Sequence, residues 1–189
     1  MPRSAAVTRQ KILETAYQLF YRKGFARVGV DSVAEHAGIT KRTLYNHFRS
    51  KDELLAAVLE FHGELALDRI RGFGAAVEHE RDPITPLFRE LARWAAQPRW
   101  SGAGFTRLVM ELADLPGHPA RNIAGRHKAA VEAWLANELS RRRIASPGLR
   151  ARQIAMLLEG AVAKMLTHDD RSYAEDAAKA AQQLMGQRR

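Results

Sequence analysis

Cysteine is absent from this 189-residue sequence, and so is any run of about 18 apolar residues. Without thiols the chain forms no disulfide and no thiolate metal site. Without a long apolar run it offers no candidate for a membrane-spanning helix. The first residues, MPRSAAVTRQK, also lack the apolar core of a signal peptide. Together these absences lead us to expect a protein of the reducing cytoplasm.

Motifs that carry catalytic or metal chemistry are missing as well. The sequence has no glycine-rich phosphate loop, no GxSxG elbow and no HExxH pair, and its seven histidines are scattered. Its acidic residues do not form a pair that can be placed in one cleft. The adjacent His168, Asp169 and Asp170 are metal-ligand types, but we favour a solvated loop there. We therefore predict that the protein is not an enzyme and has no catalytic residue, metal site or cofactor.

Internal repeats, low-complexity segments and strand-like alternation are absent too, whereas apolar residues recur at helical spacing. This spacing predicts a helix over 8–23, which Gly24 would end as a left-handed C-cap. A second, shorter helix over 30–37 would stop at Gly38. Two short helices joined by a tight turn form a helix-turn-helix. The predicted fold class is all-α.

The stretch from Ile39 to Leu55, ITKRTLYNHFRSKDELL, contains a very short helix with one apolar side. Leu44 and Phe48 lie four residues apart on that side, and a helix so short must be anchored by them to a core. Its other side is polar and carries Lys41, Arg42, Thr43, Tyr45, Asn46 and His47. A polar face is the default for any surface helix, so this pattern alone does not imply a DNA-binding role.

Charge is what favours a nucleic-acid partner. Residues 1–51 contain ten Lys and Arg against three Asp and Glu, while residues 52–189 contain twenty against eighteen. A basic excess concentrated beside a polar-faced helix points to nucleic acid. Ser50 and Glu53 also form a capping box at the start of the next helix, with Lys51 beside the cap, as in a phosphate-binding helix end.

The segment GFARVGVDSVAEHAGITKRTLYNHFRSKDELL resembles the N-terminal DNA-binding domain of the TetR family of bacterial repressors. The matching positions are Gly24, Phe25, Val33, Ala34, Ala37, Gly38, Thr40, Leu44, Tyr45, His47, Phe48, Lys51 and Leu54. The resemblance implies a three-helix DNA-binding domain over residues 1–50. It also implies a helical ligand-binding and dimerisation domain over residues 51–189.

One departure from the family concerns the start of the second helix. The family usually carries hydroxyl residues there, whereas this chain has Val28 and Gly29. A side-chain cap and a phosphate contact are therefore expected to be missing, with Asp31 or Ser32 as alternative substitutes.

The resemblance and the polar face together predict the DNA contacts. Lys41, Arg42 and Thr43 would reach base edges, and Arg42 is suited to bond a guanine through two hydrogen bonds. By resemblance Thr40, Tyr45, His47 and Lys51 would contact the backbone, and Asn46 suits either role. Arg9 would follow the backbone or reach the minor groove, unless the N-terminal arm is a disordered tail.

The C-terminal part shows further helical patterns. Asp82 before Pro83 starts one helix, residues 115–119 (LPGHP) form a loop, and a long helix covers 120–144. The two last helices carry small and apolar residues at helical spacing, which form either the core of the second domain or half of a dimer interface. The predicted interface residues are Ile154, Leu157, Leu158, Ala161, Val162, Met165, Ala177, Ala181 and Leu184.

An effector site in the second domain is implied by the resemblance only. The candidate residues are His62, Trp94, Trp100, Phe105, Met110, His127, Trp134, Met156 and Glu159. Ordinary core packing is the favoured explanation for most of the large apolar ones. From composition we expect an apolar or aromatic small molecule.

The function we predict is a ligand-responsive repressor that binds a palindromic double-stranded operator as a homodimer and is released by a small-molecule effector. Activation instead of repression fits the same features. Two alternatives from other classes are a non-specific architectural DNA binder and a helical enzyme or lipid carrier whose helix-turn-helix is only structural.

Overall fold

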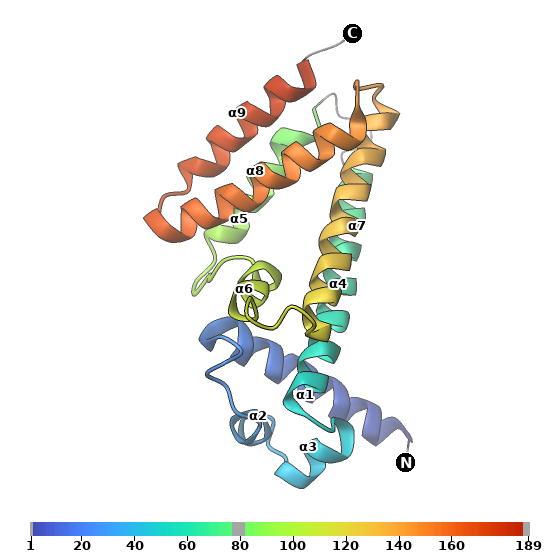
Figure 1. Cartoon of the computed structure of the whole chain (residues 1–189), viewed down its shortest axis with the longest axis vertical. Coiled ribbons are helices and arrows are strands. Elements are labelled where there is room, and N and C mark those ends of the chain that lie inside the picture. Colours follow the sequence, from blue (N-terminus) through green and yellow to red (C-terminus); the bar gives the residue numbers. More distant parts are fainter. Residues whose placement is uncertain (1, 77–81, 187–189) are drawn as a thin grey trace. The chain divides into compact units, whose positions relative to one another are not determined.

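The computed structural model describes residues 2–76 and 82–186, and all regular elements within them are helices (Figure 1). The helices are α1 (Pro2–Lys23), α2 (Val30–His36), α3 (Lys41–His47), α4 (Lys51–Ala76), α5 (Ile84–Ala95), α6 (Gly104–Glu111), α7 (Pro119–Arg141), α8 (Pro147–His168) and α9 (Ser172–Gly186). The predicted all-α class is confirmed. Among these described helices, none combines the length and the hydropathy needed to cross a bilayer.

The helices form two compact units. Unit 1 consists of Met1–Leu65 and Gly104–Arg126, and unit 2 of Ala66–Ala103 and His127–Arg189. Unit 1 therefore contains α1, α2, α3 and α6 together with the first parts of α4 and α7. The predicted functional division between residues 50 and 51 differs from this division by packing, and it stays a prediction.

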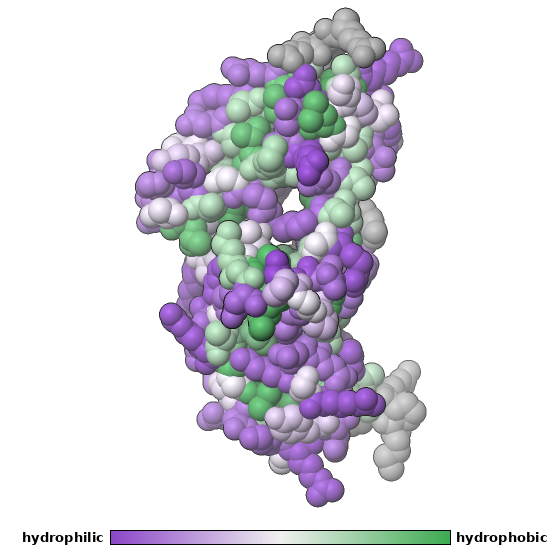
Figure 2. Space-filling view, viewed as in Figure 1, coloured by the Kyte–Doolittle hydropathy of each residue, from purple (hydrophilic) through white to green (hydrophobic). Residues whose placement is uncertain are grey.

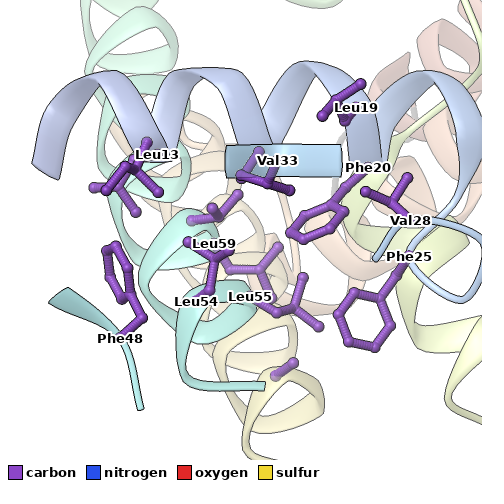
Figure 3. Packing of buried hydrophobic residues seen from close by; sticks show 14 of the residues in the cluster. Leu13, Leu19, Phe20, Phe25, Val28, Val33, Phe48, Leu54, Leu55 and Leu59 are labelled. Atoms are coloured by element: carbon purple, nitrogen blue, oxygen red, sulfur yellow. The ribbon is translucent and has the colours of Figure 1, made fainter. Parts of the chain in front are cut away.

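One hydrophobic core holds unit 1 together. Leu13 of α1, Val33 of α2 and Leu54 of α4 belong to this core, and Figure 3 shows their side chains converging beneath α1. Each of these three side chains is at most 2% exposed. Burial of one such side chain contributes about 1.5–3 kcal/mol. The core thus fixes α2 and the start of α4 against α1.

Two glycines make the turns between the first three helices. Gly24 follows α1 with φ +84° and donates its amide to the Phe20 carbonyl at 2.9 Å, as expected of a left-handed C-cap. Gly38 between α2 and α3 has φ +63°. Side chains other than glycine rarely adopt this backbone region. Both predicted helix ends are confirmed.

The core of unit 2 is built mainly by α5, α8 and α9. Phe88 of α5, Ile154 of α8 and Ala181 of α9 are buried in one cluster, and α8 and α9 run side by side (Figure 1). Asp82 lies just before α5 and accepts hydrogen bonds from the amides of Ile84 and Thr85, as predicted for a helix start.

Most of the predicted dimer-interface residues lie inside unit 2. Six of the nine are buried within the single chain, namely Ile154, Ala161, Val162, Met165, Ala177 and Ala181. A side chain that is already covered by its own chain is not exposed to a second copy. These six side chains therefore belong to the core of the single chain, and the dimer interface stays a prediction. Leu157, Leu158 and Leu184 are half-buried.

Candidate nucleic-acid interface

Helix α3 is short, capped at its start and anchored from one side. The Thr40 hydroxyl accepts a hydrogen bond from the Thr43 amide at 3.1 Å, which caps the helix. Leu44 is 0% and Phe48 1% exposed, so the apolar side of the segment lies in the unit 1 core. The remaining surface of α3 is left for solvent.

That remaining surface carries the polar residues predicted for DNA contact. Lys41, Arg42, Tyr45 and Asn46 are exposed, and Thr43 and His47 are half-buried. On the face shown in Figure 2, hydrophilic side chains prevail over the end of unit 1 that contains α2 and α3. The structure therefore brings six of the predicted contacts together on one seven-residue helix.

Lys41 has a partner that sequence reasoning missed. Its Nζ lies 2.8 Å from Asp31 Oδ1 and donates to Oδ2 at 3.0 Å. The hydrogen bond to Asp31 and its negative charge raise the pKa of Lys41 above its ordinary value. The two residues are ten positions apart across a turn, so no helical periodicity signals the pair.

The start of α2 matches the predicted departure from the family. Gly29 occupies the N-cap position, and no side chain caps the helix. Val28 is 2% exposed and belongs to the unit 1 core. Neither Asp31 nor Ser32 substitutes as a cap, since no side chain bonds the first amides of α2 and the Asp31 carboxylate pairs with Lys41.

The start of α4 carries the predicted capping box in a shifted form. The Ser50 hydroxyl accepts from the Glu53 amide at 3.0 Å. The Glu53 carboxylate accepts from the amide of Arg49, one residue before the cap, at 2.7 Å. Both bonds satisfy amides that a helix start leaves without intrahelical partners, and so they define the turn between α3 and α4.

Lys51 follows this cap, but its side chain does not extend into solvent. Its Nζ lies 4.1 Å from the centroid of the Phe25 ring and 3.5 Å from the Ala26 carbonyl oxygen. Burial lowers the pKa of Lys51. The ammonium group thus stabilises the connection between α1 and α2, and a phosphate contact by Lys51 stays a prediction.

Two residues of α6 bind the end of α1 and the segment between α1 and α2. Arg107 donates to the Tyr21 carbonyl at 2.9 Å, and the Glu111 carboxylate accepts from the Ala26 amide at 3.1 Å. Added at Gly24, a Cβ would lie 2.9 Å from the same carboxylate. The segment that precedes the helix-turn-helix is therefore tied to residues more than 80 positions later in the chain.

Arg9 lies on α1 next to the end of α3. Its guanidinium carbon is 5.2 Å from the centroid of the Phe48 ring, within the range of a cation–π contact, and the side chain is exposed. This part of the chain is helical, because α1 begins at Pro2. Arg9 thus stands on an ordered element beside the candidate interface.

The candidate effector residues are divided between the two units. His62, Phe105 and Met110 belong to unit 1, and Trp94, Trp100, His127, Trp134, Met156 and Glu159 to unit 2. The His62 ring stacks on Tyr17 with centroids 3.4 Å apart. Met110 and Met156 are 68% and 62% exposed, so neither lies in the core of its own unit.

Two pairs among the unit 2 candidates lie close together, namely Trp94 with Trp100 and His127 with Glu159. The rings of Trp94 and Trp100 meet edge to face, with centroids 5.6 Å apart. Glu159 of α8 forms an ion pair with Lys128 of α7. Burial, followed by the charge of Lys128, lowers the pKa of His127.

Comparisons with known proteins agree with this geometry. The sequence profile of "Bacterial regulatory proteins, tetR family" matches residues 12–58. The HTH-type transcriptional regulator TtgR of Pseudomonas putida is 35% identical over 83 residues, which cover 44% of this chain and 37% of TtgR. The chain thus spans little more than a third of that relative's length.

Solved structures extend the similarity over nearly the whole chain. A TetR-type transcriptional regulator of Streptomyces avermitilis MA-4680, Sav143, is 30% identical with a TM-score of 0.74, covering 93% of this chain and 98% of its own. The multidrug binding protein EbrR in complex with ethidium is 25% identical with a TM-score of 0.72, covering 94% and 97%. The chain belongs to the TetR family of bacterial transcriptional regulators.

Proposed function

We propose that this chain is a repressor that binds a palindromic operator as a homodimer in the bacterial cytoplasm and leaves it when a small molecule binds. The observation that supports the proposal is the division of α3 into a buried apolar side and an exposed polar side. Leu44 and Phe48 anchor it from inside, while Lys41, Arg42, Tyr45 and Asn46 remain exposed. In a helix-turn-helix this second helix enters the major groove.

The exposed residues of α3 suit two kinds of contact. The guanidinium of Arg42 matches the O6 and N7 acceptors of a guanine, and Thr43 and Asn46 suit other base edges. Tyr45 and the half-buried His47 suit phosphate oxygens, which set the position of the helix without reading sequence. Arg9 adds a cation beside the same surface.

A palindrome requires two copies of the helix, and unit 2 offers a surface for a second chain. Leu149 and Met156 of α8 are 56% and 62% exposed. Met156 also lines a hollow of about 480 Å³ between α8 and α9, together with Gln153, Leu157, Ala180, Gln183 and Leu184. Exposed apolar side chains around a shallow hollow suit a self-complementary contact between two copies. Leu157 and Leu184, both half-buried, are the predicted interface residues that remain in this surface.

The effector is expected to be a flat aromatic molecule. The relative EbrR has been solved with proflavin and with ethidium, and Trp94, Trp100 and Trp134 of this chain's unit 2 are half-buried aromatic side chains. Such a ligand releases DNA only if it binds the DNA-free conformation more tightly than the DNA-bound one.

Selection of binding sites from a random duplex pool tests the proposal. We expect the wild-type chain to enrich a palindrome and to shift it as two chains per duplex. Because ethidium and proflavin themselves intercalate into DNA, their binding is measured on the free protein without duplex, where we expect the wild-type chain to bind them. Equal affinity for random duplex, with a steep dependence on salt, would indicate an architectural DNA binder instead. A single chain on the enriched duplex would refute the dimer.

A further inference from the structure

The first turn of α2 presents a carboxylate beside the candidate DNA-binding surface. Asp31 lies in this turn, and its side chain is 70% exposed. It pairs with Lys41, the first residue of α3, whose side chain is 56% exposed. The pair is therefore accessible from solvent and to a duplex that approaches α3.

The Asp31 carboxylate binds the Lys41 ammonium group in the same way as a DNA phosphate would. An ammonium group is a point charge that binds oxygen acceptors of either kind. Both carboxylate oxygens lie within 3.0 Å of Lys41 Nζ, so Asp31 offsets part of the charge of Lys41 in the free protein. Lys41 must leave Asp31 before it can make full contact with DNA.

We infer that Asp31 competes with DNA for Lys41 and thereby limits the affinity of the protein for any duplex. The inference rests on the proposed function, because it concerns the same DNA-binding surface. Two effects act in the same direction: the ion pair must open, and the freed carboxylate then lies close to negatively charged phosphates.

The size of the effect follows from the exposure of the pair. Exposed ion pairs are weak, so a duplex can open this one, and removal of Asp31 should tighten binding only roughly 1.5- to fivefold at low salt. A Lys41 that is no longer held by Asp31 can neutralise one further phosphate. Without Asp31, the slope of log K against log salt should therefore steepen by at most about 0.9.

Five variants and the wild type separate this competition from a general charge effect. Asp31→Asn removes the charge with little change in shape, and Asp31→Ser repeats the removal with another side chain. Glu35→Gln is the matched control, since Glu35 is an exposed carboxylate one turn later on the same helix. Asp31→Asn combined with Lys41→Ala tests whether the effect passes through Lys41, relative to Lys41→Ala alone.

The measurement is duplex affinity at several salt concentrations, on the selected site and on a random duplex, with circular dichroism to verify folding. We expect both Asp31 variants to bind both duplexes more tightly and with steeper slopes, Glu35→Gln to change binding less, and Asp31→Asn to have little effect once Lys41 is alanine. Unchanged or weaker binding by both Asp31 variants, or equal tightening without Lys41, overturns the inference alone. If the wild type binds neither duplex, the proposed function fails and this inference fails with it.

Discussion

The side chains of Leu44 and Phe48 lie four residues apart and are both buried in the unit 1 core, while Tyr45 between them is 42% exposed. This division into a buried side and a solvent side, over a seven-residue helix, is the feature on which the proposed DNA binding depends. Such a short helix is not stable by itself, so its orientation comes from these two anchors.

Truncation of one anchor should therefore cost global stability. Leu44→Ala removes a fully buried side chain and should lower the free energy of unfolding by about 2–5 kcal/mol. Met110→Ala is the control, since Met110 is 68% exposed and should change stability by less than about 0.5 kcal/mol. Urea denaturation measures both. Similar losses for the two variants would contradict the packing described for unit 1.

Replacement of an exposed cation on α3 should affect DNA binding but not folding. Arg42→Ala is expected to weaken binding to the selected site by about 1–3 kcal/mol and to relax the preference for one guanine in each half-site. Arg89→Ala removes the same charge from an exposed position on α5. Each variant is titrated with the selected duplex and with a duplex in which one guanine is changed. An equal loss of affinity in the two variants would exclude base recognition by Arg42.

Gly24 and Glu111 should be energetically coupled. Gly24→Ala imposes a positive φ on alanine, at about 1–2 kcal/mol, and brings its Cβ to 2.9 Å from the Glu111 carboxylate. Glu111→Ala removes that contact but leaves the Ala26 amide without its acceptor. Gly24→Ala should thus cost less in the Glu111→Ala background than in the wild type. A double-mutant cycle by denaturation measures the coupling, and strict additivity would argue against the contact.

The sequence allowed the helix-turn-helix to be predicted because its signals are local. The spacing of Leu44 and Phe48, the Ser50 cap and the turn glycine Gly38 each act within a few residues, and each was confirmed. Local signals could not decide whether the small and apolar residues on α8 form the core of the second domain or a dimer interface. Periodicity shows which face of a helix is buried, but not which element packs against that face. Ile154 packs against helices of the same chain.

Contacts between distant positions could not be predicted from local patterns. Glu111 and Ala26 are separated by 85 residues, and nothing in either segment signals the other. Lys51 was predicted as a phosphate contact from the family pattern, yet its position over the Phe25 ring depends on how α1 and α4 pack. For the same reason the ion pair of Asp31 and Lys41 could not be predicted from the sequence, because it depends on how the turn places α2 against α3.

Acid should weaken the link between α5 and α9. Burial alone would raise the pKa of Asp82, but hydrogen bonds from Thr85, Gln182 and the Ile84 amide outweigh it, so the pKa lies below its ordinary value. A group with a lowered folded pKa contributes stability above its unfolded pKa of about 3.9 and loses it as the pH falls. Asp82→Asn should therefore lose less stability than the wild type between about pH 6 and pH 3. Denaturation at each pH tests this, and parallel losses would exclude a role for Asp82.

A charge on the exposed face of α8 should disrupt the proposed dimer. Met156→Asp introduces a carboxylate into the proposed contact between copies and should shift sedimentation from dimer to monomer. Met110→Asp is the matched control, since Met110 is similarly exposed but lies on α6 of unit 1. Loss of the dimer in both variants, or in neither, would place the contact elsewhere.

Protection of guanine N7 from methylation on the selected duplex tests major-groove docking of α3 most directly, because N7 is exposed only in the major groove. We predict protection at two half-sites whose centres lie about one helical turn or somewhat more apart, with one guanine in each half-site losing protection in Arg42→Ala. Methylation that is unaffected by bound protein, or protection that is identical for wild type and Arg42→Ala, would contradict the account.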